Sequence, residues 1–137
     1  MFDKDAKVEA ISHVPLFSRC SKNELRRIAQ LADEIDLPAG RVLCKEGSIG
    51  REFFVLLEGT VDVRSNTRLL PDLGPGDFFG EIALVVDSPR TATVRTMTPV
   101  RALVITDRAF RELTRQSPDI QGKVLEAVAL RLAKTIY

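Results

Sequence analysis

The residue types best suited to chemistry are gathered in one glycine-rich segment, GPGDFFGEIALVVDSPRTA, which runs from Gly74 to Ala92. After the glycines, the letters GEIAL predict a single turn of helix. Backbone amides in the first turn of a helix have no partner within that helix, so those of Ile82 and Ala83 are expected to favour an anion. The small side chain of Ala83 leaves room for an anionic oxygen to approach the backbone. The segment therefore predicts an anion site at the start of a short helix.

An arginine, Arg90, follows the turn sequence DSP, seven residues beyond Ala83. That turn can fold the guanidinium back over the start of the short helix. A guanidinium presents a planar fork that binds two phosphate oxygens at once. A triphosphate site would require a lysine in a GK[ST] element and an acidic metal ligand, and this segment has neither. The pattern thus favours a phosphate with about one negative charge.

Glu81 poses a conflict, because a carboxylate at the same helix start repels a bare phosphate. The conflict disappears if the ligand carries a hydroxyl donor beside its phosphate, as a ribose does. A nucleoside 3′,5′-cyclic monophosphate offers one charge, a ribose 2′-hydroxyl and a base that needs an apolar wall. Two simpler roles for Glu81 stay open, namely interaction with the helix dipole and an ion pair with Arg90.

Three other kinds of site do not fit the sequence. A dinucleotide fingerprint fails because three residues rather than two separate Gly76 from Gly80, and no βαβ unit surrounds them. A metal site is not predicted, because the only histidine is His13 in the N-terminal region and the strands lack clustered carboxylates. No histidine lies near a serine or cysteine of the β region, and no GxSxG motif occurs. The sequence therefore predicts no catalytic residue, no metal and no cofactor, and so not an enzyme.

The composition is that of an ordinary globular protein. The 137 residues suffice for one domain, and 45% of them are hydrophobic and 28% charged. The 20 basic and 19 acidic residues leave a net charge of +1, which gives no reason to expect direct nucleic-acid binding. No apolar run reaches about 18 residues, so no membrane span is predicted. Cys20 and Cys44 form neither a CxxC pair nor a disulfide framework, which favours a reduced, cytoplasmic setting, and Cys44 is expected to be buried.

Residues 1–33 are predicted to be helical. Val8, Ile11 and Val14 recur with the spacing of one helix face, and the proline that follows ends the pattern. The letters SKNE, which begin at Ser21, form a capping box that opens a second helix.

Residues 34–106 change to short β-type runs separated by turn residues. The runs are EIDL, RVLC, EFFVLLE, TVDVR, TRLL, TATVR and RALVI, and glycine-rich or polar turns separate them. Many short strands at this spacing favour a sandwich, a jelly roll or a barrel. Residues 107–137 return to helix, where Ser117 and Pro118 begin a last helix that reaches about Ile136.

The letters FGEIAL, VVDS and PRTATV resemble the phosphate-binding cassette of cyclic-nucleotide-binding domains, the module of catabolite activator proteins, cyclic-nucleotide-dependent kinases and gated channels. The preceding stretch LPAGRVLCKEGSIGREFFVLLEGTVDVR is similar to the strands of that family. The resemblance covers nearly the whole chain and implies one domain over residues 1–137, with the cassette at 80–92. It implies a mainly β (α+β) fold: an eight-stranded antiparallel β-roll of jelly-roll type, with N-terminal helices and a C-terminal hinge or lid helix.

The resemblance also implies roles for the cassette residues. Gly80, Ile82 and Ala83 would offer backbone contacts to the phosphate and the ribose. Glu81 would accept a hydrogen bond from the ribose 2′-hydroxyl, and Arg90 would pair with the cyclic phosphate.

Four further residues are implied to contact the ligand. Thr91 would add a hydroxyl near the phosphate and the base, and Ala92 a backbone amide. Val63 and Leu73 would line the base, although a role as plain core residues is about as well supported. In family members with threonine at this position the hydroxyl can bond the guanine amino group, yet such members also answer to cAMP. Thr91 thus leaves the choice of base open; the expected ligand is cAMP, with cGMP as the alternative.

The last helix corresponds to the position of the family's lid, and its candidate lid residues are Leu125, Arg131 and Leu132. The expected function is that of a regulatory sensor that repositions this helix when it binds a cyclic nucleotide. No helix-turn-helix, kinase or channel sequence follows the helix. The expected partner is an effector protein, or a second copy in a homodimer formed through the C-terminal helix; the alternative is that the sequence is a piece of a longer protein. The alternative function is that of a ligand-free interaction or dimerisation module of the same fold.

Overall fold

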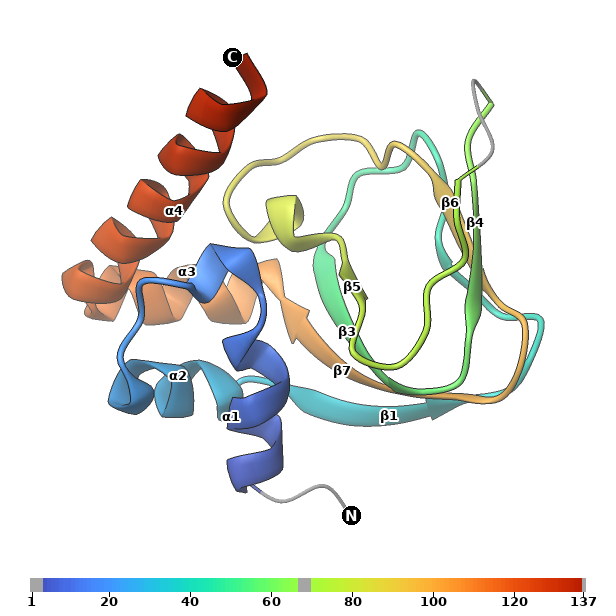
Figure 1. Ribbon diagram of the computed structural model, residues 1–137, viewed down its shortest axis with the longest axis horizontal. Helices are drawn as coiled ribbons and strands as arrows, with labels where there is room; N and C mark the ends of the chain where they lie inside the picture. Colours follow the sequence, from blue (N-terminus) through green and yellow to red (C-terminus); the bar gives the residue numbers. More distant parts are fainter. Residues whose placement is uncertain (1–3, 67–69, 137) are drawn as a thin grey trace.

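The computed structural model of the chain describes residues 4–66 and 70–136, with side chains up to residue 130 (Figure 1). Helices lie at both ends of the sequence and gather on one side of a β-roll. They are α1 (Lys4–Ser12), η1 (Pro15–Phe17), α2 (Lys22–Ala29), α3 (Asp107–Gln116) and α4 (Pro118–Ile136). Between them lie β1 (Asp33–Leu37), β2 (Val42–Cys44), β3 (Glu52–Glu58), β4 (Val61–Arg64), β5 (Phe78–Phe79), the short 3₁₀ helix η2 (Glu81–Leu84), β6 (Thr93–Thr96) and β7 (Val100–Thr106).

The strands form two antiparallel sheets, one in the order β1-β7-β3-β5 and one in the order β2-β6-β4. The fold is the expected antiparallel β-roll, and the described residues hold seven strands where the resemblance implied eight. The expected strand TRLL falls mostly on residues 67–69, which lie outside the described residues. The two-residue strand β5 was not predicted; it pairs with β3, where Phe79 lies opposite Phe54.

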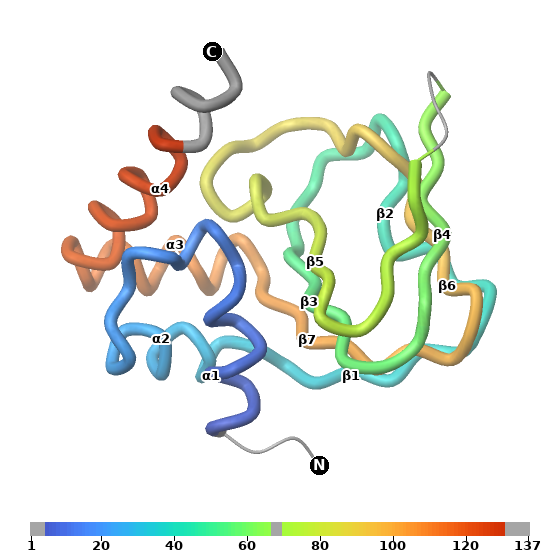
Figure 2. The backbone as a smooth tube through the Cα atoms, in the orientation of Figure 1, coloured from blue at the N-terminus to red at the C-terminus, as the bar shows by residue number. Residues whose placement is uncertain are grey.

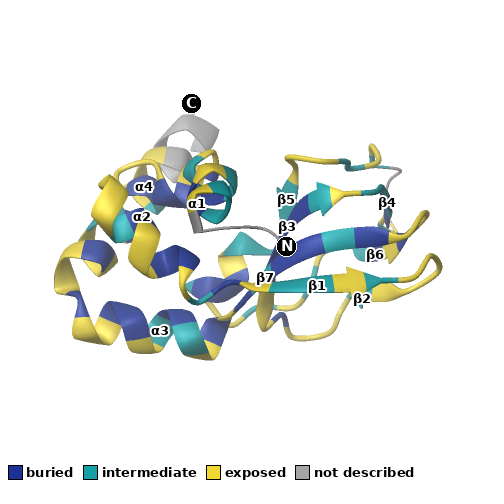
Figure 3. Cartoon of the chain, turned by 90° about the horizontal axis from the view of Figure 1, so that it is seen from below, coloured by how far each residue is buried: buried dark blue, intermediate teal, exposed yellow. Residues whose placement is uncertain are grey.

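The central strands β3 and β7 of the four-stranded sheet are buried on both faces, and alternate residues of each strand point to opposite sides. On β3, Phe53 and Val55 face the helices, whereas Phe54 and Leu56 face the interior of the roll. This explains why the sequence EFFVLLE reads as a continuous apolar run instead of an alternating one. Figure 3 shows the buried middle of this sheet between the helices and the rest of the roll.

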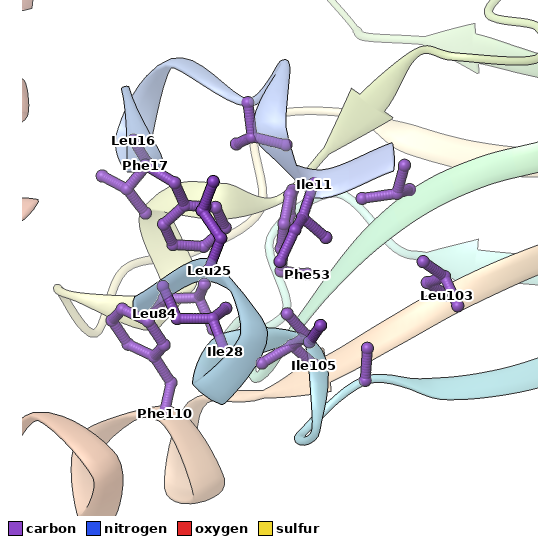
Figure 4. Close-up of a cluster of buried hydrophobic side chains, with 14 of the residues drawn as sticks. Ile11, Leu16, Phe17, Leu25, Ile28, Phe53, Leu84, Leu103, Ile105 and Phe110 are labelled. Atoms are coloured by element: carbon purple, nitrogen blue, oxygen red, sulfur yellow. The ribbon is translucent and has the colours of Figure 1, made fainter. Parts of the chain in front are cut away.

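The N-terminal helices cover the outer face of that sheet. Figure 4 shows Ile11, Phe17 and Ile28 directed toward Phe53 and its neighbours in one cluster of buried side chains. The predicted capping box is confirmed: the Glu24 amide donates to Ser21 Oγ at 3.2 Å, and the Ser21 amide donates to Glu24 Oε1 at 2.8 Å.

The first half of α4 is packed against the other helices. Ile120 and Val124 are buried in the cluster that also holds the N-terminal helices. Lys123 Nζ lies 2.5 Å from Glu24 Oε1, so an ion pair joins α4 to the start of α2. Leu125 points outward and is 56% exposed. No helix in the described part of the chain has the length and apolar character needed to cross a membrane.

Candidate functional site

A cavity of about 340 Å³ opens between η2, the loop that follows it, and the inner face of the three-stranded sheet. Figure 2 shows the yellow segment that contains η2 and this loop, at the end of the roll nearest the helices. Every predicted ligand-contacting residue lines the cavity: Val63, Leu73, Gly80, Glu81, Ile82, Ala83, Arg90, Thr91 and Ala92. Residues far apart in the sequence, from β4 and from the cassette, are thus brought to one place.

The start of η2 follows a glycine turn, as predicted. Gly80 has a φ of +84°, a backbone conformation that residues with a Cβ rarely adopt. The prediction that both Ile82 and Ala83 offer free amides is wrong for Ala83. Its amide donates to the Gly80 carbonyl at 3.1 Å, because a 3₁₀ turn closes its bonds three residues apart and not four.

Arg90 lies over the start of η2, as its position after DSP predicts. Its Nη2 donates to the backbone carbonyl of Glu52 at 2.6 Å. The Cβ position of Gly80 is 2.5 Å from Arg90 Nη1, and that of Gly50 is 2.8 Å from Arg90 Cζ. The guanidinium therefore occupies the space that side chains at Gly50 and Gly80 would fill.

The loop before β3 holds the other side of this arginine. The Arg90 amide donates to the Ser48 carbonyl at 2.6 Å, and the Gly47 amide donates to the Arg90 carbonyl at 2.9 Å. The Gly50 amide also donates to the Ser88 carbonyl at 3.2 Å. The sequence reading treated EGSIG only as a turn and missed this pairing. A second glycine three residues after the first was the available signal, since a residue without a side chain often marks close approach of another group.

Much of the cavity lining is apolar. Val63 is buried on β4, and Phe79 stacks on Phe54 with their ring centroids 4.9 Å apart. Cys44 is buried as expected and also lines the cavity. Burial raises the pKa of the Cys44 thiol to about 11, although the positive charge of Arg90 acts in the opposite direction.

The remaining predicted residues stand around the opening. Glu81 and Ala92 are half-buried, and Thr91 is exposed. Leu125 does not line the cavity, and the side chains of Arg131 and Leu132 lie outside the described residues. In the described part of the chain, no three His, Cys, Asp or Glu side chains come together as metal ligands.

One fixed cation beside an apolar wall can hold a ligand that carries an anion at one end and a flat apolar group at the other. The cavity volume falls at the lower end of the range for small-molecule sites, about 300–1,000 Å³. Residues 34–117 match the profile of the family described as "Cyclic nucleotide-binding domain". The chain belongs to this family. The match spans the strands of the roll, η2 and helix α3.

Proteins of several kinds are similar to this cyclic nucleotide-binding domain. A cyclic nucleotide-gated potassium channel of Rhizobium etli is 36% identical over 112 residues, which are 82% of this chain and 31% of the channel. A CRP-like cAMP-activated global transcriptional regulator of Mycobacterium tuberculosis is 28% identical over 132 residues, or 93% of this chain and 59% of the regulator. The chain thus spans less than two thirds of the length of either relative.

A solved structure supports the same fold. The N-terminal domain of a transcriptional regulator from Streptomyces coelicolor superposes with a TM-score of 0.83 at 28% identity. The superposition covers 92% of this chain and 94% of that domain.

Proposed function

We propose that this domain binds a nucleoside 3′,5′-cyclic monophosphate in the cavity and serves as a regulatory sensor and not as an enzyme. The observation that carries the proposal is the placement of Arg90. Its guanidinium donates a hydrogen bond to the Glu52 carbonyl and fills the space beside Gly50 and Gly80, at the start of η2. The cavity around it has a largely apolar lining. A phosphate there would pair with the arginine, and the attached base would cover the apolar wall.

The other cassette residues fit the same ligand. Glu81 lines the cavity at the start of η2, where its carboxylate can accept a hydrogen bond from a ribose hydroxyl. Val63 and Leu73 line the cavity and would contact the base. Gly80 and Ile82 lie where backbone groups can reach the phosphate and the ribose, while the amide of Ala83 would have to leave the Gly80 carbonyl in order to contribute.

The favoured ligand is cAMP, with cGMP as the alternative. Two kinds of relatives are named for cAMP: the mycobacterial regulator and a cAMP-dependent protein kinase regulatory subunit of Mycosarcoma maydis, which is 33% identical over 109 residues. Thr91 stands at the opening with an exposed side chain, where a hydroxyl can contact either base.

The proposed output is a population shift of the C-terminal helix. Ligand binding would order the cassette and change the position of α4, with Leu125, Arg131 and Leu132 as candidate lid residues. Leu125 and Leu130 are exposed on α4, so the helix presents apolar side chains to an effector protein or to a second copy of this chain.

Calorimetric titration of cAMP and cGMP tests the proposal, with protein that has been unfolded, dialysed and refolded to remove nucleotide from the expression host. Arg90→Ala should weaken binding by about 2–4 kcal/mol, because it leaves a buried phosphate without its counter-charge. Arg95→Ala is the matched control, since Arg95 is an exposed arginine of β6 that does not line the cavity. It should bind like the unmodified chain.

Saturable binding that is lost in Arg90→Ala and kept in Arg95→Ala would establish the sensor site. Absence of binding by either nucleotide to refolded protein would refute it and favour the ligand-free interaction module. Hydrogen exchange of α4 with and without nucleotide tests the switch. Equal protection of the helix in both states would contradict it.

A further inference from the structure

Asp107 is a buried carboxylate at the N-terminus of α3, and it is 6% exposed. Two arginines from different parts of the chain approach its Oδ2: Arg51 Nη1 at 3.6 Å and Arg111 Nη1 at 3.7 Å. Its other oxygen accepts a hydrogen bond from the Arg108 amide at 2.7 Å. A buried charge with this many donors is held in place by its surroundings, so Asp107 is a fixed point at the start of α3.

Arg111 joins this fixed point to the cassette. While Nη1 faces Asp107, Nη2 lies 2.9 Å from Asp87 Oδ1 and 3.5 Å from the carbonyl oxygen of Ala83. Asp87 belongs to the loop between η2 and Arg90, and Ala83 belongs to η2 itself. A single guanidinium therefore connects α3 with both ends of the 83–87 turn, which lines the cavity at Ala83 and leads to Arg90.

Arg51 joins the same fixed point to the other wall of the site. The Asp107 amide donates to the Arg51 carbonyl at 2.8 Å. Arg51 lies between Gly50 and Glu52, which together hold the guanidinium of Arg90. Both segments that position Arg90 are thus attached to the first residue of α3.

The end of α3 leads directly into α4. Ser117 is the single residue between the two helices and is 6% exposed. Its amide donates to the Thr114 carbonyl at 3.2 Å, and the Gln121 amide donates to the Ser117 carbonyl at 3.2 Å. A displacement of α3 is therefore carried into α4 without a flexible linker between them.

From this arrangement we infer that Arg111 is a positioning residue for the ligand site. It holds the 83–87 turn on α3, so that the cassette and Arg90 are set for binding, and it transmits occupancy of the cavity to α3 and α4. Leu84 already anchors the inner side of the turn in the core, where it is 1% exposed. Arg111 controls the outer side, at Asp87. The transmission of cavity occupancy to α3 and α4 rests on the proposed function, whereas the holding of the 83–87 turn by Arg111 does not.

The first experiment needs no ligand. Hydrogen exchange of the backbone amides of residues 83–88 and of Arg90 is compared in the unmodified chain, Arg111→Ala and Arg115→Ala. Arg115 is the matched control, since it lies one turn later on α3 and pairs with Glu112 of the same helix. We expect exchange in the turn to be at least about threefold faster in Arg111→Ala and unchanged in Arg115→Ala. Thermal unfolding of each variant shows that it is folded.

The second experiment measures cAMP affinity. Arg111→Ala should raise the dissociation constant about threefold to tenfold, and Arg115→Ala should leave it unchanged. Asp87→Asn should also raise the dissociation constant. The Arg111→Ala, Asp87→Asn double variant should bind cAMP no more weakly than Arg111→Ala alone, because both substitutions remove the same ion pair between Arg111 and Asp87. Arg111→Lys keeps the charge but lacks the fork that reaches two carboxylates, so it should restore only part of the affinity.

The outcomes separate the two proposals. If the turn of Arg111→Ala exchanges at the rate of the unmodified chain, the inference is overturned, whatever the nucleotide does. If the turn exchanges faster but affinity and nucleotide-induced protection of α3 are unchanged, the coupling of Arg111 to the site is overturned. If the unmodified chain binds neither nucleotide, the proposed function fails, and the exchange experiment still decides whether Arg111 holds the turn.

Discussion

The Cβ position of Gly50 lies 2.8 Å from both Cζ and Nε of Arg90, closer than any real Cβ approaches another heavy atom. The planar guanidinium therefore lies directly on the backbone of the loop that precedes β3. Arg90 also donates to the Glu52 carbonyl at 2.6 Å, so a side chain at position 50 would displace the guanidinium from this hydrogen bond. The glycine is thus a determinant of the ligand site, although it contributes no side chain.

Gly50→Ala is expected to displace the guanidinium and to weaken cyclic nucleotide binding about tenfold, a loss comparable to that of one charged hydrogen bond. Gly76→Ala provides the contrast. Gly76 has a φ of +89° and open space around its Cβ position. This substitution should lower the free energy of unfolding by about 1 kcal/mol and leave affinity unchanged. Calorimetry and thermal unfolding of both variants check the prediction. Equal affinities of Gly50→Ala and Gly76→Ala for the nucleotide would contradict it.

Thr91→Ala is expected to weaken cGMP binding more than cAMP binding, because guanine carries a 2-amino group that the hydroxyl can bond, and adenine has no group at that position. Thr91→Ser keeps the hydroxyl and should retain the preference of the unmodified chain. Both ligands are titrated into all three proteins. Losses of equal size for the two nucleotides would show that Thr91 does not read the base.

The ion pair between Glu24 and Lys123 should make stability depend on pH. The hydrogen bond from Lys123, followed by the bond from the Ser21 backbone, holds the pKa of Glu24 below its ordinary value of 4.5. A lowered pKa in the folded state means that the stabilisation is present above the ordinary value and is lost as pH falls through the folded value.

Glu24→Gln is therefore expected to lower the melting temperature by roughly 2–4 °C at any pH from about 5 to 7. The difference from the unmodified chain should begin to shrink as the pH falls below 4.5, where Glu24 of the unfolded chain takes up a proton, and should vanish below the lower pKa of the folded state. Thermal unfolding at a series of pH values measures this. A difference that persists undiminished at the lowest pH would mean that the charge of Glu24 is not responsible.

The thiol of Cys44 should react slowly, because burial raises its pKa from 9.0 to about 11. At pH 8 its thiolate population is about a hundredfold smaller than that of an ordinary thiol, and alkylation should be slower in proportion. Cys20→Ser leaves Cys44 as the single thiol, so that the rate with iodoacetamide can be assigned. The rate should rise with pH up to about 11. Reaction at pH 8 as fast as that of a free thiol would show that the cavity wall is solvated.

Local patterns in the sequence were sufficient for the features that depend on neighbouring residues. The capping box at Ser21 and the glycine turn before η2 are confirmed because their hydrogen bonds join residues three or four apart. The position of the roll between two helical regions followed from the change of apolar period along the chain. The placement of Arg90 over η2 also followed, since only a short turn separates them.

Contacts between distant segments could not be read in this way. Gly50 against Arg90 and Arg111 against Asp87 join residues separated by 40 and 24 positions along the chain. The engaged amide of Ala83 was missed for a different reason: GEIAL is compatible with an α-helical or a 3₁₀ turn, and the two differ in which carbonyl accepts the bond.

Periodicity, caps and turns act over a few residues, so they predicted a β region between helices and a glycine turn before a short helix. The β-roll and the cassette were predicted from the resemblance of the sequence to the family. The pairing of the 47–50 loop with residues 88–90 and the attachment of both to α3 depend on which strands become neighbours when the roll closes. Closure follows from burying two apolar faces of one sheet at once, a property of the whole chain that no short segment contains.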